Sequence, residues 1–186
     1  MDPQRRTREA RFEELFALAR DPLLRYLARR ADPDTVEDLF AEAMTVAWRR
    51  LDDVPAGAEL PWLYGVGRKV LANHRRSGSR FGRLVERLAI VNRDPDPRLL
   101  LGAGIDADLA DAMANLPRND AEILRLWAWE DLSASEIAAA LQITPNAASI
   151  RLHRAKAHLK DALENNRRKT APIAGHQSGV ERTEAR

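Results

Sequence analysis

Apolar residues recur every three or four positions along most of this chain, and the alternation of apolar and polar residues that marks β-strands is absent. The spacing places apolar side chains along one face of an α-helix, so the chain buries them only by packing helices together. It predicts helices over about 8–30, 34–51 and 61–76, and a second group of helices from about residue 106. Hydrophobic residues make up 45% of the chain, enough to build helical cores.

Clusters of helix-breaking residues separate the two groups of helices. Ser77 and Gly78 follow the third predicted helix, and the segment NRDPDP at 92–97 holds two prolines. Each proline disfavours a helical conformation at the residue before it, so this segment predicts a linker. From Asn165 onward the chain has almost no apolar content, which predicts a disordered basic tail. The expected organisation is a domain over 1–77, a flexible linker over 78–105, a domain over 106–164 and a tail over 165–186.

Two glycines, Gly65 and Gly67, lie inside the third predicted helix. Each costs about 1 kcal/mol relative to alanine in a helix interior. We expect them either to soften this helix or to admit a close neighbour.

The formal net charge is only +2, but the charges are segregated along the chain. Counted as Lys+Arg minus Asp+Glu, residues 31–59 carry −6, residues 68–87 carry +6 and residues 106–136 carry −6. Residues 145–160 carry four basic residues and no acid. A basic surface suits phosphate groups, whereas an acidic surface repels DNA and suits a protein partner. The pattern predicts two modules, each with an acidic and a basic surface; the alternative is a chance segregation of solvated helix faces.

Several classes of protein are excluded by what the chain lacks. It has no cysteine, which excludes a disulfide scaffold, a thiol nucleophile and a cysteine zinc site. Its four histidines show no metal-ligand spacing, and it has neither a nucleophile elbow nor a phosphate-binding loop. No apolar run approaches the roughly 18 residues of a membrane span, and the N-terminus has no apolar signal segment. We therefore expect a cytoplasmic protein that is not an enzyme, binds no metal or cofactor and does not insert into a membrane.

Residues 132–160 carry the pattern of a helix-turn-helix. Ser133 and Glu136 form the S-x-x-E spacing of a capping box, which starts a short helix. A tight turn at Gln142 and Ile143 follows, and Thr144 then caps a second helix with a proline in its first turn. Two helices joined in this way, the second rich in basic residues, are typical of DNA-binding proteins.

The second of these helices has one apolar and one polar face. The apolar face is the predicted core side and holds Ala148, Leu152, Ala155, Leu159 and Leu163. The polar face fits a major groove, where side chains reach base edges and phosphates. The alternative is an ordinary helical hairpin with a solvated basic face. The residues predicted to contact DNA are Asn146, Ser149, Ile150, Arg151, His153, Arg154 and Lys156.

Four segments together resemble a known family. They are FEELFALARDPLLRYLARR (12–30), DTVEDLFAEAMTVAWRRLDDV (34–54), PWLYGVGRKVLANHRR (61–76) and LPRNDAEILRLWAWEDLSASEIAAALQITPNAASIRLHRAKAHL (116–159). The second is similar to the pattern D-x-x-D-L-x-Q-E-x-F-x-x-A-W, and the third to W-L-x-x-I-A-R-N. In this order and spacing they resemble the bacterial RNA polymerase sigma factors of the sigma-70 family, extracytoplasmic-function (ECF) group.

The resemblance implies a division of labour between the two domains. The family's N-terminal domain docks on core RNA polymerase and opens the −10 promoter element, and its C-terminal domain binds the −35 element. The implied function is to direct core RNA polymerase to specific promoters and to promote strand opening. Core RNA polymerase and promoter DNA are the implied partners, together with an anti-sigma factor, which often holds members of this family inactive.

The resemblance also implies site residues in the N-terminal domain. The acidic helix 34–51 corresponds to the polymerase-binding face, with Asp38, Glu42 and Arg49 as contacts. The loop 52–60 and the start of the third helix correspond to the place where the family captures a flipped base. For the third helix, the alternatives are solvated basic side chains and a core aromatic. The residues expected to contact the −10 element are Asp53, Trp62, Arg68, Lys69, Asn73, Arg75 and Arg76. Where this chain has Lys69 the family usually has asparagine, which predicts a different −10 preference.

A second reading is a helix-turn-helix transcriptional regulator that acts without being a polymerase subunit. Such a protein is expected to add a dimerisation or ligand-binding domain. The region 8–76 leaves little room for one in 186 residues.

Overall fold

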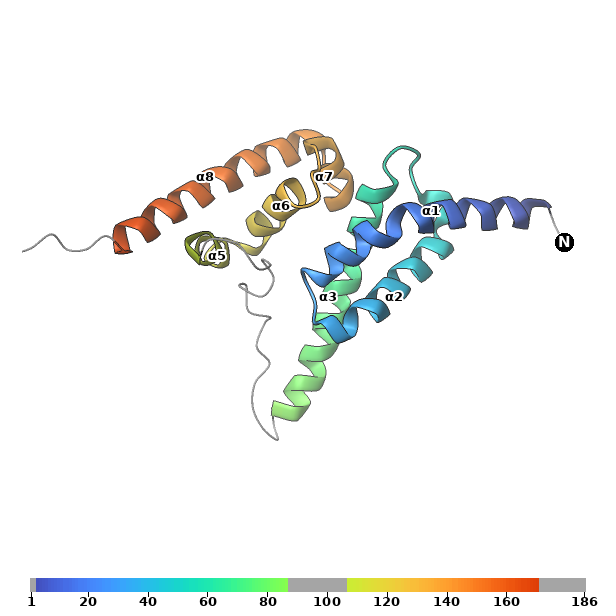
Figure 1. Ribbon diagram of the computed structural model, residues 1–186, viewed down its shortest axis with the longest axis horizontal. Coiled ribbons are helices and arrows are strands. Elements are labelled where there is room, and N and C mark those ends of the chain that lie inside the picture. Colours follow the sequence, from blue (N-terminus) through green and yellow to red (C-terminus); the bar gives the residue numbers. More distant parts are fainter. Residues whose placement is uncertain (1–2, 87–106, 171–186) are drawn as a thin grey trace, which may run out of the picture.

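The computed structural model describes residues 3–86 and 107–170, and the side chains of residues 7–77 and 107–168. Every regular element in these residues is a helix (Figure 1). The prediction of an all-α protein is confirmed. The elements are α1 (Pro3–Ala28), η1 (Pro33–Thr35), α2 (Val36–Arg49), η2 (Leu51–Asp53), α3 (Glu59–Glu86), α5 (Ala107–Ala114), α6 (Arg118–Ala128), α7 (Ala134–Leu141) and α8 (Pro145–Thr170), where η marks a single 3-10 turn.

The helices α1, α2 and α3 pack against one another and bury a common core. The side chains of Leu23, Tyr26, Leu27 and Leu63 are fully buried in it. Within the helix predicted over 34–51, apolar residues at helical spacing form one stripe, and the structure buries all of them: Val36, Phe40, Ala43, Ala47 and Leu51. The opposite face of α2 is therefore left to solvent, as the spacing predicts.

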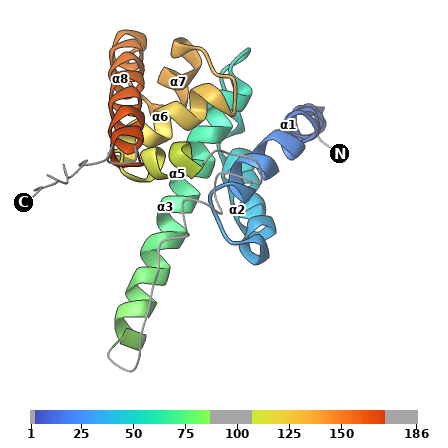
Figure 2. The same ribbon diagram turned by 60° about the vertical axis from the view of Figure 1, so that its left-hand side comes forward.

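The helix α8 packs along α5, α6 and α7 (Figure 2). Ala148 and Ala155 are fully buried, and Leu152, Leu159 and Leu163 are half-buried. This confirms the core side predicted for α8, the second helix of the helix-turn-helix. Burial of this face leaves the basic face of α8 exposed.

The predicted helix-turn-helix is formed with its expected caps. The Ser133 hydroxyl accepts a hydrogen bond from the backbone N–H of Glu136 (3.3 Å), and the Glu136 carboxylate accepts one from the backbone N–H of Ser133 (2.8 Å). Hydrogen bonds from the Ser133 side chain and backbone lower the pKa of Glu136. The turn places Gln142 in the left-handed conformation (φ 56°), and Thr144 caps α8 by accepting from the backbone N–H of Ala147 (3.2 Å).

Two helices extend further than the sequence predicts. The predicted end of the third helix at Arg76 is wrong, because α3 runs on through Ser77 and Gly78 to Glu86. Gly78 and Gly82 in the added turns each cost only about 1 kcal/mol relative to alanine, and the arginine, leucine and glutamate residues of the same turns are good helix formers. Similarly, α8 continues into the predicted tail as far as Thr170. Its last turns pack on α5, where the Asn166 amide donates to the carbonyl oxygen of Asp108 (3.4 Å). The remaining parts of the predicted linker and tail, 87–105 and 171–186, lie outside the described residues.

The two groups of helices pack directly against each other, with α7 on α3. Gly65 makes this close approach possible, because a Cβ atom there would lie 2.7 Å from the carbonyl oxygen of Ala140 in α7. A Cβ at Gly67 would lie 3.2 Å from a methyl carbon of Leu23 within the N-terminal bundle. Both glycines therefore admit a close neighbour. No helix in the described part of the chain is long and apolar enough to cross a membrane.

Candidate nucleic-acid interfaces

The face of α8 that the sequence predicts to contact DNA is exposed at all seven positions. Ile150, an apolar residue in the middle of this face, is 51% exposed. The Lys156 ammonium lies 3.6 Å from the centroid of the Trp127 ring, so a cation–π contact holds this side chain against α6. Trp127 follows the buried Leu126 in α6, but its own side chain is 43% exposed. Helical periodicity alone does not separate an exposed tryptophan from a buried one.

A polar contact fixes α8 relative to α6. His158 Nδ1 lies 2.6 Å from Asp120 Oδ2, and the Asp120 side chain is largely buried. Together with the apolar face of α8, this contact sets the direction in which the basic face points.

The exposed face of α2 carries the residues expected to bind polymerase. Asp38, Glu42 and Arg49 are exposed, and Asp38 and Glu42 lie one helical turn apart. Glu37 is exposed beside them. The first half of α2 therefore presents an acidic surface on a helix whose other side is anchored in the core.

Arg50 connects two of the residues expected at the −10 element, Asp53 in η2 and Trp62 in the first turn of α3. The Arg50 guanidinium donates to the Asp53 carboxylate (2.8 Å) and lies 5.6 Å from the centroid of the half-buried Trp62 ring. Trp62 also packs against the hydrophobic core. Sequence reasoning used Arg50 only in the charge count, and its spacing of three residues from Asp53 is the signal that identifies the pair.

The remaining −10 candidates are spread over two sides of α3. Lys69 Nζ donates to the Gln142 side-chain oxygen in the turn of the helix-turn-helix (2.8 Å), and Arg75 donates to the carbonyl oxygen of Arg30 (2.9 Å). Asn73 accepts a hydrogen bond from Arg76. Lys69 therefore bonds to the C-terminal domain, whereas Arg75 bonds within the N-terminal domain.

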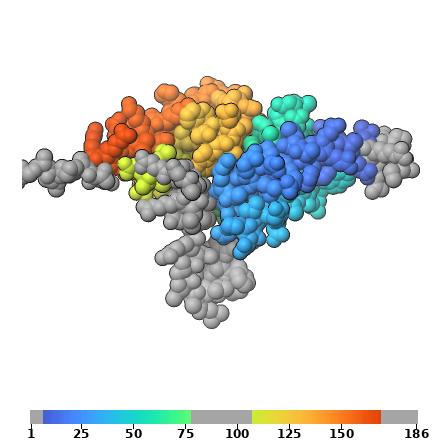
Figure 3. Space-filling model, in the orientation of Figure 1, coloured from blue at the N-terminus to red at the C-terminus, as the bar shows by residue number. Residues whose placement is uncertain are grey.

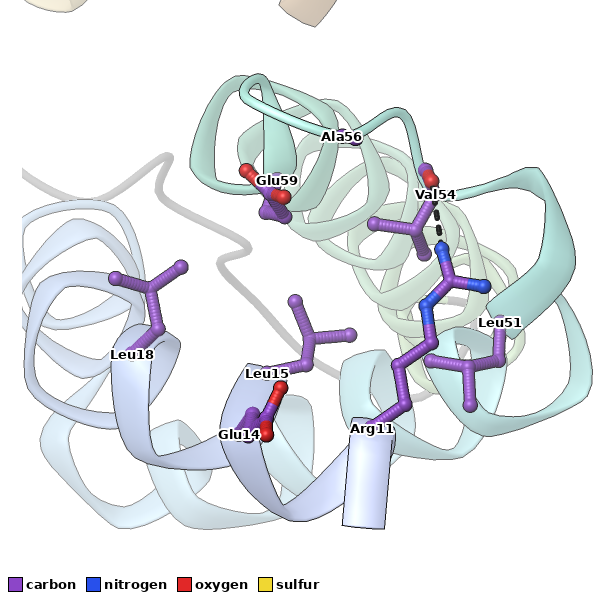
Figure 4. Close-up of a pocket in the computed structure, with 8 residues that line it drawn as sticks. All are labelled: Arg11, Glu14, Leu15, Leu18, Leu51, Val54, Ala56 and Glu59. Atoms are coloured by element: carbon purple, nitrogen blue, oxygen red, sulfur yellow. Dashed lines mark hydrogen bonds between the residues drawn. The ribbon is translucent and has the colours of Figure 1, made fainter. Parts of the chain in front are cut away.

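A pocket of about 370 Å³ lies between α1 and the segment that connects α2 to α3 (Figure 4). Arg11 spans one side of it by donating to the carbonyl oxygen of Val54 (3.1 Å). The Glu59 carboxylate accepts from the backbone N–H of Gly57 (2.9 Å), and backbone hydrogen bonds lower its pKa. The pocket combines apolar walls with charged rims, and its lining residues are Arg11, Glu14, Leu15, Leu18, Leu51, Val54, Ala56 and Glu59.

Buried ion pairs join the two domains, whose surfaces meet where α6 and α7 adjoin α1 and the start of α3 (Figure 3). The Glu130 carboxylate, whose side chain is 3% exposed, accepts hydrogen bonds from Arg29 and Arg30, both at 3.0 Å. Glu122 accepts from Tyr26 Oη (3.2 Å) and Arg30 Nε (3.4 Å). Burial acts to lower the pKa of Arg30, but Glu122, Tyr26 and Glu130 outweigh it and raise the pKa. These partners lie about 100 positions apart in the chain, and no local pattern in the sequence points to them.

A segment in the C-terminal half of the chain matches a known family model. Residues 106–159 match the model described as sigma-70, region 4. The chain is 32% identical over 157 residues to the RNA polymerase sigma-E factor of Streptomyces antibioticus, covering 82% of this chain and 84% of the relative. It is 33% identical over 159 residues to the RNA polymerase sigma-E factor of Streptomyces avermitilis, covering 83% of this chain and 86% of the relative.

Two solved structures have a similar fold, and each is a complex with a second protein. The sigma factor RpoE of Bartonella quintana, solved with the anti-sigma factor NepR, has a TM-score of 0.60 and 20% identity over 82% of this chain and 96% of that one. CnrH, solved with the cytosolic domain of CnrY, has a TM-score of 0.53 and 25% identity over 83% of this chain and 88% of that one. Both similarities extend over the N-terminal and the C-terminal helices.

Proposed function

The chain belongs to the RNA polymerase sigma factors of the sigma-70 family, in the ECF group, and we propose how its two domains divide the work of promoter recognition. It is a promoter-specificity subunit that associates with core RNA polymerase and directs it to promoter DNA. A regulator that never binds polymerase does not fit, because the similarity to sigma factors covers the N-terminal helices as well as the helix-turn-helix. Sigma factors are regulatory subunits, and we propose that this chain has no catalytic activity of its own and acts in the cytoplasm.

We assign −35 recognition to the C-terminal domain, α5–α8. The observation that carries this assignment is the exposed polar face of α8, which follows a fully capped turn and is backed by a buried apolar face. The N-terminal part of such a helix enters the major groove. Arg154 and His153 would reach base edges or phosphates, and the exposed Ile150 suits a thymine methyl.

We assign polymerase binding and −10 recognition to the N-terminal domain, α1–α3. The acidic face of α2 suits a basic protein surface, whereas it would repel DNA. The pocket beside the 52–60 loop, with the Asp53–Arg50–Trp62 group near it in sequence, supports capture of an unstacked base in this region. Arg68, Arg75 and Arg76 supply positive charge for the separated strands, and the neutral Asn73 amide can hydrogen-bond to them.

Run-off transcription tests the proposed function. Purified core polymerase from the source organism is incubated with and without this protein on sheared genomic DNA. We expect discrete new 5′ ends that share upstream −10 and −35 sequences. The contradicting outcome is a protein that shifts DNA and binds core polymerase but yields no new transcripts when both are present. The proposed role as a promoter-specificity subunit would then be wrong.

Glu42→Arg should weaken binding to core polymerase by roughly tenfold or more, because it places a like charge against the surface that the acidic face meets. The measurement is a fluorescence titration of labelled protein with core enzyme. Glu13→Arg, the same charge reversal at an exposed position of α1, is the matched control. Equal affinities for all three proteins would remove α2 from the polymerase interface.

Arg154→Ala should reduce −35 binding by about 1–3 kcal/mol if its guanidinium reads a base edge bidentately. The measurement compares affinity for duplexes with matched and scrambled −35 sequences. Lys160→Ala removes an exposed charge further along α8 and should have little effect on discrimination. Equal losses on the two duplexes would make Arg154 a phosphate contact instead.

A further inference from the structure

A cavity of about 430 Å³ lies between the two domains, and arginines dominate its wall. The N-terminal domain contributes Arg30, which follows α1, and Arg68 and Arg75 from α3. The C-terminal domain contributes Arg118 and Arg125 from α6. Glu122 is the one acidic side chain among the described residues that line it. Because both domains supply walls, the cavity exists only when the domains are packed together.

Three guanidinium nitrogens in this wall lack hydrogen-bond partners. They are Arg30 Nη2, Arg68 Nε and Arg125 Nε, and they are the three buried side-chain polar atoms without a partner in the described part of the chain. The Arg30 side chain is only 4% exposed. A buried charged donor that makes no hydrogen bond loses its hydration without compensation, so atoms of this kind rarely persist without a ligand or water to accept from them.

Two carboxylates pair with the cavity arginines, fewer than the guanidinium groups there: Glu130, which accepts from Arg30 (3.0 Å) but is not among the lining residues, and Glu122. Glu122 is shared by the Tyr26 hydroxyl (3.2 Å), Arg30 (3.4 Å) and Arg125 (3.9 Å). The pKa of Arg125 is lowered, chiefly by burial. Glu122 acts to raise this pKa, whereas the positive charges of Arg30 and Arg75 lower it further. The arginines therefore repel one another across the cavity, and a bound anion would relieve this repulsion.

We propose that this cavity binds a phosphate-bearing anion, which bridges the arginines of both domains and holds the domains together. Guanidinium groups present paired N–H donors that match the oxygens of a phosphate group. The cavity volume lies in the range of small-ligand sites. Several converging cations favour a multiply charged phosphate over a single carboxylate. The same chemistry is offered by inorganic pyrophosphate and by the phosphate tail of a nucleotide.

The bound anion would act against promoter binding, a consequence that rests on the proposed function. A ligand that binds only the packed arrangement shifts the population toward it. In that arrangement Lys69 is held by Gln142, and Arg68 and Arg75 face the cavity. The packed arrangement therefore engages three of the residues proposed to contact the −10 element, and separation of the domains would release them.

The test uses the full chain without polymerase or DNA. Radiolabelled pyrophosphate is measured by equilibrium dialysis at constant ionic strength, with ATP as a competitor and chloride as the background anion. Because the chain has no cysteine, Glu13→Cys and Lys160→Cys allow specific labelling of α1 and α8 for an interdomain FRET signal. We expect saturable binding at one site per chain and a shift of the FRET signal toward the packed arrangement. Displacement by ATP identifies a nucleotide tail as a ligand, and resistance to ATP identifies the inorganic anion; either supports the site.

Variants separate this site from general attraction of anions. Arg125→Gln and, from the other domain, Arg68→Gln should each weaken pyrophosphate binding at least about tenfold. Arg20→Gln removes an exposed positive charge from α1 outside the cavity and should bind as the unmodified chain does. Circular dichroism checks that each variant is folded. Absence of saturable binding, or an equal loss in Arg20→Gln, would overturn the proposal. Neither result bears on run-off transcription, so failure of this site is distinguishable from failure of the sigma-factor function.

Discussion

Glu130→Ala should drive the two domains apart. Its carboxylate, 3% exposed, is the shared acceptor for Arg29 and Arg30, and its loss leaves the buried Arg30 with Glu122 as its remaining carboxylate partner. Removing one partner of a buried ion pair costs about 3–5 kcal/mol, because the other charge stays buried without compensation. Arg30 escapes this cost if the domains separate and water reaches it. The packed population should therefore fall by roughly a hundredfold or more.

The FRET pair on α1 and α8 measures this separation directly. Asp52→Ala is a suitable control, because it removes the Arg8–Asp52 ion pair at the surface, where the carboxylate side chain is 78% exposed. Exposed pairs contribute about 0–1 kcal/mol, so the interdomain signal should stay unchanged. An unchanged signal in Glu130→Ala as well would mean that the buried pairs do not hold the domains together.

Gly65→Ala should also open the domains while stabilising the helix that carries it. The new Cβ atom would lie 2.7 Å from the Ala140 carbonyl oxygen, a backbone atom that moves only if α7 moves. Overpacking of this kind costs about 1–3 kcal/mol, so the packed population should fall by about 5- to 150-fold. In contrast, alanine is favoured over glycine in a helix interior by about 1 kcal/mol, which raises the stability of the N-terminal domain.

Gly67→Ala separates these two effects. It gives the same gain in helix propensity, but its Cβ meets side-chain atoms of Leu23 and Tyr26 at 3.2 and 3.3 Å within the N-terminal domain. These side chains can shift by a few tenths of an ångström, and α7 is not among the contacts. The interdomain FRET signal should therefore remain that of the unmodified chain. If Gly65→Ala and Gly67→Ala give the same signal, the close approach of α7 to α3 does not control domain packing.

Local patterns determined the helices and their faces. The buried stripe from Val36 to Leu51 follows from helical periodicity, and the start of α7 follows from the Ser133–Glu136 capping box. Both are short-range effects, in which a side chain acts on its own turn or the next one. The same locality explains the errors at Arg76 and Asn165, because a weak breaking signal ends a helix only when neighbouring turns or tertiary contacts do not sustain it.

The site residues divide in the same way. The exposed positions of α8 follow from the position of its apolar face, so the sequence alone predicts which residues can meet DNA. In contrast, Arg50 beside Trp62 and Lys156 on Trp127 depend on how separate elements pack. Which of the basic residues on α3 face solvent and which face the other domain also depends on this packing.

By itself, the sequence determined an all-α chain with a capped helix-turn-helix and the order of segments that marks a sigma factor. Only the tertiary structure decided that Arg30 is buried against Glu130, that Gly65 admits the backbone of Ala140, and that arginines from both domains converge on one cavity. The physical reason is the range of the interactions. Helix formation and capping act over a few residues, whereas burial of a charge depends on surfaces that meet only when distant segments pack.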